Sequence, residues 1–228
     1  MTNKLIIAVA IVVIIVMSYS KIVAYMSIEP TTAGRISREW NVSGTYSNKR
    51  AAAELLSRAN AKMINFMRVL KEKYHINETD QQIAEEGDDH FDMINSPNDL
   101  HNIVYHMLCN YNPDAFYEND PGLSSETSYT VNKGSSMYLC LRNKNNPNKL
   151  VEESDLLFVL LHEASHIANY KGWGHESDFW TVFKFILHEA QLSGVYVPSD
   201  YSRKPILYCG MEVKYNPLYD DLIPNIWE

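Results

Sequence analysis

The stretch "LLHEASHIANYKGWGHESDFW", from Leu160 to Trp180, holds three histidines and decides how the rest of the chain is interpreted. His162 and His166 are four residues apart, so a helix places them on one face, one turn from each other. Glu163 lies about 100° further round the helix, at about 3.6 residues per turn. Two imidazoles can therefore point at one metal ion from a rigid frame, while the carboxylate of Glu163 reaches a water molecule bound to that metal.

A helix that carries these residues is predicted from Glu152 to Tyr170. Its segment "LLFVLL" is apolar all round, which is typical of a helix at the centre of a domain. Gly172 and Gly174 end the helix, and His175 follows at once. Since a catalytic zinc ion needs a third protein ligand, we predict that His175 supplies it.

The residues after His175 are expected to support it. Phe179 and Trp180 can pack the returning segment into the core. Asp178 or Glu176 could accept a hydrogen bond from a ligand imidazole.

The expected chemistry is hydrolysis of a peptide bond through a zinc-bound water. His162, His166 and His175 would hold Zn²⁺, which keeps an open position for the water and lowers its pKa. Glu163 would act as the general base and then return the proton to the leaving amine. The predicted substrate is a protein or peptide.

Three other interpretations of the stretch stay open. A helix that merely buries two histidines and a glutamate is costly, because their polar groups would lack partners. A non-enzymatic structural or assembly protein could keep zinc for folding, closed by a fourth ligand such as Cys209 or an acid. A zinc hydrolase could also act on another amide, such as one in a cell wall. Glu163 favours an enzyme, since a structural site has no use for a base.

The segments "HEASH" and "GHESDFW" resemble the zincin superfamily of metallopeptidases, and most closely the SprT-like and WLM-type group. The resemblance covers Met137 to Gln191 and implies the same three zinc ligands and the same base. It also implies that Ser136–Arg142 corresponds to the edge strand along which zincins bind an extended peptide. The chain departs from the group in the eight residues between His166 and His175, and in Ser165, where a small apolar residue is usual.

The fold class expected from the chain is α+β, with a small sheet beside the active-site helix. Helices are predicted at 47–74, from 98 or 99 to Asn112-Pro113, at 152–170 and at 177–193, and a strand pair at 128–142 around Asn132-Lys133-Gly134. The acidic segment 76–99, which contains His90, is predicted to be a loop, and the tail 195–228 to be ordered by packing rather than by regular structure.

The N-terminal 26 residues are strongly hydrophobic. Leu5 to Met17 carries no charge, which favours a retained single-pass membrane anchor over a cleaved signal peptide or a buried core element. Lys4 and Lys21 flank it, so the orientation stays open. Residues 1–26 are therefore interpreted as the anchor, 27–46 as a linker and 47–228 as the catalytic domain, in a viral or host membrane. The asparagine- and tyrosine-rich composition would suit a large DNA virus.

The formal net charge of −8 makes nucleic acid an unfavourable partner. The three cysteines, Cys109, Cys140 and Cys209, are sparse and far apart, which favours core side chains over a disulfide framework and allows at most one bridge. The oligomeric state stays open. Candidates for a group that steadies the oxyanion lie downstream of His175, with no preference among them: Tyr196, Tyr201, Arg203 and Tyr208.

Overall fold

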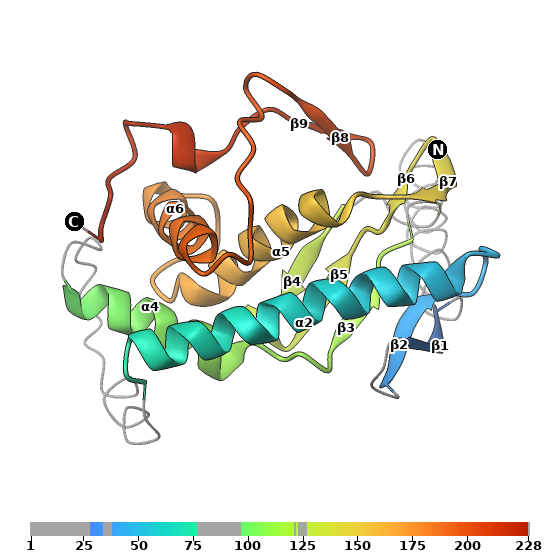
Figure 1. Cartoon of the computed structure of the whole chain (residues 1–228), viewed down its shortest axis with the longest axis horizontal. Coiled ribbons are helices and arrows are strands. Elements are labelled where there is room, and N and C mark those ends of the chain that lie inside the picture. The colour runs from blue at the N-terminus through green and yellow to red at the C-terminus, as the bar shows by residue number, and fades with distance from the viewer. Residues whose placement is uncertain (1–27, 34–37, 77–96, 121, 123–126, 228) are drawn as a thin grey trace, which may run out of the picture.

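The computed structural model describes residues 28–33, 38–76, 97–120, 122 and 127–227. The helices are α2 (Lys49–Lys73), α4 (Pro97–Asn110), α5 (Glu153–Ala168) and α6 (Ser177–Leu192), with 3-10 turns η2 (Asn132–Gly134) and η3 (Pro217–Tyr219). The strands are β1 (Ile28–Ala33), β2 (Arg38–Ser43), β3 (Phe116–Glu118), β4 (Tyr129–Val131), β5 (Ser136–Leu139), β6 (Arg142–Asn143), β7 (Asn146–Leu150), β8 (Ile206–Tyr208) and β9 (Met211–Val213). Helices combined with small sheets confirm the α+β class, and the four helices lie close to their predicted ranges (Figure 1).

The main sheet has the strand order β1-β2-β3-β5-β4. It is mixed: β2 pairs in parallel with β3 and β3 with β5, whereas β1–β2 and β4–β5 are antiparallel. The predicted strand pair at 128–142 is confirmed as β4 and β5, which are joined by η2. Two separate two-stranded sheets, β6–β7 and β8–β9, lie outside this sheet.

The first two strands correct the prediction that residues 27–46 are a linker. Residues 28–33 and 38–43 form β1 and β2, and β2 joins the main sheet through β3. Trp40 and Val42 alternate along β2 and are both buried in the core. This alternation is the period-2 pattern of a strand with one buried face, which outweighs the polar composition around it.

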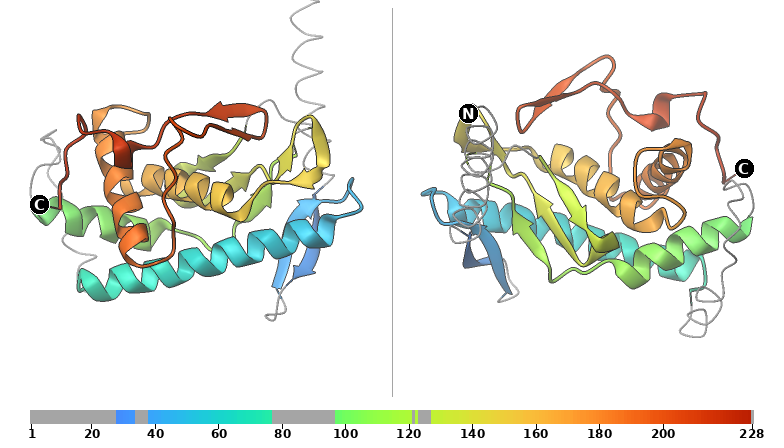
Figure 2. Two further views of the ribbon diagram at one scale, coloured as in Figure 1. Left: turned by 45° about the horizontal axis from the view of Figure 1, so that its top comes forward. Right: turned by 180° about the vertical axis from the view of Figure 1, so that it is seen from behind.

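The helices enclose one hydrophobic core together with the sheet. Figure 1 shows α2 running along the length of the molecule with β3, β5 and β4 behind it, and the view from behind in Figure 2 shows these strands in front of the helix. Helix α5 contacts α2, α4, α6 and β4, so it lies at the centre of the fold. Its leucines are buried, as expected for a helix that is apolar on every side.

The C-terminal segment corrects two further predictions. Residues 206–213, within the tail predicted to lack regular structure, form the β8–β9 hairpin, which is antiparallel. Cys209, in its turn, forms a disulfide bond with Cys140, so the prediction of three unpaired core cysteines is wrong. Cys109 is free and exposed. The spacing of the cysteines in the sequence did not indicate this disulfide, because the two residues are 69 positions apart.

The membrane prediction is also corrected. Within the part of the chain that the structure describes, no helix is both long enough and apolar enough to cross a membrane, which contradicts the predicted transmembrane helix and membrane localisation. The segment on which that prediction rested, residues 1–26, lies outside the described residues, as does the acidic segment 77–96 with His90.

Candidate metal centre

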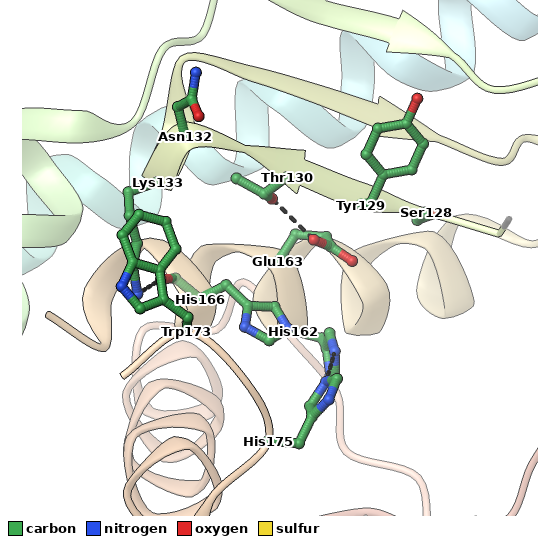
Figure 3. A pocket seen from close by; sticks show the side chains of 10 residues that line it. All are labelled: Ser128, Tyr129, Thr130, Asn132, Lys133, His162, Glu163, His166, Trp173 and His175. Carbon is green, nitrogen blue, oxygen red and sulfur yellow. Dashed lines mark hydrogen bonds between the residues drawn. The ribbon is translucent and has the colours of Figure 1, made fainter. Parts of the chain in front are cut away.

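Helix α5 presents His162 and His166 one turn apart, with ring centroids 5.0 Å from each other. The helix ends after Ala168, and the chain turns so that His175 comes back to the same face. The ring of His175 lies 5.0 Å from that of His162 and 4.7 Å from that of His166. The structure therefore brings together the three histidines that the sequence predicts as ligands (Figure 3).

The ring nitrogens of these histidines converge. One nitrogen from each ring lies within 4.8 Å of the others, and the Nε2 atoms of His162 and His175 are 3.0 Å apart. Ligand nitrogens about 2.1 Å from a tetrahedral zinc ion lie roughly 3.4 Å from each other, so little movement would seat an ion among them. Three imidazoles without a carboxylate suit zinc better than magnesium or calcium, which prefer oxygen ligands.

The aromatic ring of Phe179 packs against all three histidines. Its ring centroid lies 4.9 Å from that of His162, 4.3 Å from that of His166 and 4.6 Å from that of His175. Trp180 lies beside His175, at 5.8 Å. The expected packing of the returning segment by these two aromatic residues is confirmed.

Burial keeps two of the imidazoles neutral in the metal-free protein. The pKa of His162 falls to about 3 and that of His166 to about 4, chiefly because burial disfavours the charged imidazole, with repulsion from the neighbouring histidines adding to the shift. Neutral imidazole is the form that binds a metal ion.

Glu163 lies on the same helix but points toward strand β4. It is 4% exposed, and its Oε2 accepts a hydrogen bond of 2.8 Å from Oγ1 of Thr130 (Figure 3). Burial raises the pKa of Glu163 to about 7, while hydrogen bonds from the side chain and backbone of Thr130 oppose the shift. A carboxyl group that titrates near neutrality can both accept and return a proton.

Lys133, in the turn between β4 and β5, holds the end of α5. Its Nζ donates to the carbonyl oxygens of His166 at 3.0 Å and Asn169 at 2.6 Å, and also to that of Gly172. These carbonyls belong to the last turn of the helix and to the segment that leads to His175, so the ammonium group fixes where that segment starts. Lys133 also lies over the ring of Trp173, 4.8 Å from its centroid.

Glycine at position 134 lets this turn approach the rest of the fold. Its φ is +113°, and a Cβ there would collide with the carbonyl oxygen of Asn110 at the end of α4. Sequence reasoning identified the Asn132-Lys133-Gly134 turn but missed the roles of Lys133 and Thr130. Both depend on contacts with α5, and sequence spacing does not reveal those contacts.

The strand beside the site is β4, which corrects the expectation placed on Ser136–Arg142. In the described sheet β5 lies between β3 and β4, and β4 is at the edge. Strand β4 carries Thr130 and crosses over the centre of α5 (Figure 3). A substrate that pairs with the sheet at this site would therefore pair with residues 129–131.

Two cavities adjoin the histidines. The smaller, about 250 Å³, is lined by β4, Lys133 and Trp173, and the larger, about 560 Å³, by α5, α6 and β9. Of the four oxyanion candidates only Tyr208 lines either cavity, and its hydroxyl already donates to the carbonyl oxygen of Cys140 at 2.7 Å. Tyr196 and Tyr201 are buried in the core, and Arg203 is exposed beside Asp200.

The other predicted contacts of the ligands are absent. Among the described residues, neither Asp178 nor Glu176 hydrogen-bonds a histidine of the cluster; Glu176 instead accepts a bond of 3.1 Å from the backbone N–H of Gly174. Ser165 donates to the carbonyl oxygen of Leu161 at 2.7 Å, within its own helix, so its hydroxyl is satisfied without disturbing the site.

The ligand cluster contains no fourth protein ligand within the described ranges: the three histidines are its only members. Cys209, the suggested fourth ligand, is engaged in its disulfide with Cys140 and offers no thiolate.

Comparison with known proteins shows a similarity over part of the chain. No protein-family model matches the chain, and no solved structure matches it. The chain is similar to the uncharacterized protein R325 of Acanthamoeba polyphaga mimivirus, with 32% identity over 97 residues. The match covers 42% of this chain and 48% of the viral protein, so it spans about half of that relative's length. Membership of the zincin superfamily stays a prediction.

Proposed function

We propose that this protein is a zinc-dependent peptidase with a zincin-like site, in which His162, His166 and His175 bind Zn²⁺ and Glu163 is the general base. The observation that carries the proposal is the convergence of three ring nitrogens within 4.8 Å, with a buried carboxyl group next to the first ligand on the same helix. A cluster of this kind in a cavity is a candidate for catalysis rather than for packing.

Zinc held by three imidazoles would polarise a carbonyl group and make a water molecule more acidic. The residues of the chain do the rest. Thr130 holds Oε2 of Glu163, and the Glu163 carboxylate takes the proton of the attacking water and passes it to the leaving amine nitrogen. Thr130 keeps the carboxylate aimed in one direction.

A structural role for zinc is less well supported. Structural zinc sites are usually closed by four protein ligands. The described residues provide three at this position, and the disulfide occupies the cysteine that could have been the fourth. An extended peptide is the favoured substrate because β4 is the last strand of the described sheet and lies beside the cluster. Its scissile amide would lie against the metal centre.

The test uses the full chain, expressed with zinc, and measures metal content and cleavage of a mixed peptide library. We expect one zinc per chain and loss of cleavage by at least about 100-fold in Glu163→Gln, with the zinc retained. Glu54→Gln, on the exposed face of α2, is the matched control and should leave both unchanged. Cleavage that survives Glu163→Gln would disprove the assigned base.

The ligand set is tested separately. His162→Ala, His166→Ala and His175→Ala should each lose bound zinc and cleavage together, whereas His75→Asn, at an exposed position, should lose neither. A wild-type protein that is folded and contains no zinc after reconstitution would refute the proposal.

A further inference from the structure

The larger cavity beside the histidines is apolar. It has a volume of about 560 Å³, within the range of sites that hold small ligands or side chains. The aromatic rings of Phe158 and Phe183 line it, with ring centroids 5.3 Å apart. Trp180 from α6 and Val213 from β9 line its sides.

The cavity is continuous with the candidate metal centre. His162, Glu163 and His175 line it as well as the smaller cavity. The ring of Phe183, which lines the cavity, lies 5.1 Å from that of His162. A group in this cavity therefore lies directly beside the histidines and the general base.

Charge is confined to the rim. Apart from Glu163 and the histidines, the only ionisable side chains of the lining that carry charge at neutral pH are Glu212 and Lys214. They pair with each other at 2.9 Å and are 52% and 63% exposed, so they face solvent rather than the interior. An apolar side chain gains by entering such a space, whereas a charged one would lose its hydration without a partner.

The outer wall is the β8–β9 hairpin, which covalent and polar links fix to the strands near the site. The disulfide joins Cys209 in its turn to Cys140, just after β5. The hydroxyl of Tyr208 donates to the carbonyl oxygen of Cys140 at 2.7 Å and lies 3.2 Å from Oγ of Ser128. The wall therefore keeps a defined distance from α5 and α6.

We propose that this cavity receives a bulky apolar side chain, of the size of phenylalanine or leucine, from a peptide bound at the metal centre, and that the β8–β9 hairpin sets this preference. The inference rests on the proposed peptidase function for the cleavage step alone. Recognition of the side chain depends on the apolar walls and can be measured without turnover.

The experiment measures binding to full-length Glu163→Gln, with and without zinc, by ligand-observed NMR. The probes are the acetylated peptide amides Ac-Gly-Xaa-Gly-NH₂ with phenylalanine, leucine, alanine or aspartate at Xaa. The phenylalanine peptide should bind about 10- to 100-fold more tightly than the alanine peptide, because it buries a whole aromatic ring. The aspartate peptide should bind no better than the alanine peptide.

Two substitutions on the same hairpin locate the preference. Val213→Asp puts a carboxylate into the wall and should remove the preference for phenylalanine. Leu207→Asp changes an exposed residue of β8 that does not line the cavity and should keep it. Met211→Asp, at the half-exposed mouth, provides a second wall variant if Val213→Asp disturbs folding.

The outcomes separate this inference from the proposed function. Equal affinity for the phenylalanine and alanine peptides in the Glu163→Gln protein with an unaltered hairpin would overturn the pocket. Equal losses of the preference when Val213→Asp and Leu207→Asp are added to that protein would also overturn it. A preference that persists in a protein without zinc or cleavage would support the pocket and refute the peptidase. If the wild-type protein cleaves peptides at rates that do not depend on apolar side chains, the peptidase function is supported and the pocket is refuted.

Discussion

At the scale of single residues, the site depends on the contact between Thr130 and Glu163. Replacing Thr130 with valine keeps the shape of the side chain and removes the hydrogen bond of 2.8 Å to Oε2. The carboxylate then loses its fixed direction, and we expect kcat for peptide cleavage to fall roughly 10-fold, the worth of one hydrogen bond to a charged group. Zinc content should change little, since the hydroxyl of Thr130 bonds Glu163 rather than a ligand histidine.

Thr130→Ser is the conservative variant that checks this interpretation. It restores a hydroxyl at the same position and should recover most of the lost kcat. If serine fails to rescue the rate while the melting temperature is unchanged, Thr130 does not act through its hydroxyl group.

Another residue-scale prediction concerns His106, which is stacked on Tyr170 with ring centroids 4.6 Å apart. Burial lowers the pKa of His106, and Lys133 adds to the shift. The folded state therefore binds the proton less tightly than the unfolded state. Stability contributed by the neutral ring is present above the ordinary pKa of about 6.5 and is lost as the pH falls below it.

The measurement is the midpoint of urea unfolding between pH 7.5 and pH 5 for the zinc-loaded protein. His106→Gln should flatten the fall of stability toward low pH relative to the wild type. His75→Asn changes an exposed histidine and should leave the slope unaltered. Identical slopes in all three proteins would show that His106 titrates normally.

Local geometry explains which residues of the site could be predicted from the sequence. His162, Glu163 and His166 follow from helical spacing alone, and His175 follows from a helix end with a histidine just beyond it. Thr130 and Lys133 reach α5 from 33 residues or more away in the sequence. Nothing in their own neighbourhood indicates that contact, because it is created by the pairing of β4 with β5 and the packing of the sheet on α5.

At the scale of elements, the turn η2 and helix α5 are joined by Lys133. Lys133→Met would leave the three carbonyl groups of His166, Asn169 and Gly172 without their donor. We expect the affinity for zinc to fall roughly 10-fold, as when an outer partner of a metal site is removed, because the segment leading to His175 loses its anchor. Competition with a chelator of known affinity measures this, and Lys149→Met, on the exposed strand β7, should show no loss.

The disulfide bond acts between elements as well, since it ties the β8–β9 hairpin to the end of β5. Replacing both Cys140 and Cys209 with serine opens a loop of 69 residues and should lower the free energy of unfolding by about 2–4 kcal/mol. The wall of the apolar cavity should loosen at the same time, so the preference for phenylalanine over alanine peptides should weaken while zinc stays bound. Cys109→Ser is the matched control, because that cysteine is free.

Strands were predicted less well than helices for a physical reason. Each helix carries its own hydrogen bonds and its own periodicity over 14 residues or more. Strands β1 and β2 pair with each other, and β2 joins the main sheet only through β3, which lies far along the chain. The polar residues and glycines around them therefore favoured a linker. The alternation of Trp40 and Val42 was the available signal, but two residues are too few to decide it.

At the scale of the whole molecule, the fold holds the candidate metal centre between two different surfaces. One side carries strand β4 with Lys133 and Trp173, and the other carries an apolar cavity lined in part by the C-terminal hairpin. The residues that line the two cavities lie between 127 and 215. The site therefore needs strand β4 and the C-terminal hairpin as well as the helices, although the ligands come from one stretch of 14 residues, 162–175.

Because one large core supports the site, removal of the metal should weaken the protein without unfolding it. At free zinc about 1,000-fold above its dissociation constant, binding adds about 4 kcal/mol to the stability of the folded state. For a chain of 228 residues this corresponds to a melting temperature roughly 8–16 °C lower after chelation. Calorimetry before and after treatment with 1,10-phenanthroline should still record one cooperative transition, with unchanged far-ultraviolet circular dichroism at 25 °C. An unfolded metal-free chain would instead mean that zinc is required for folding, and a melting temperature indifferent to chelation would mean that the three histidines bind no metal.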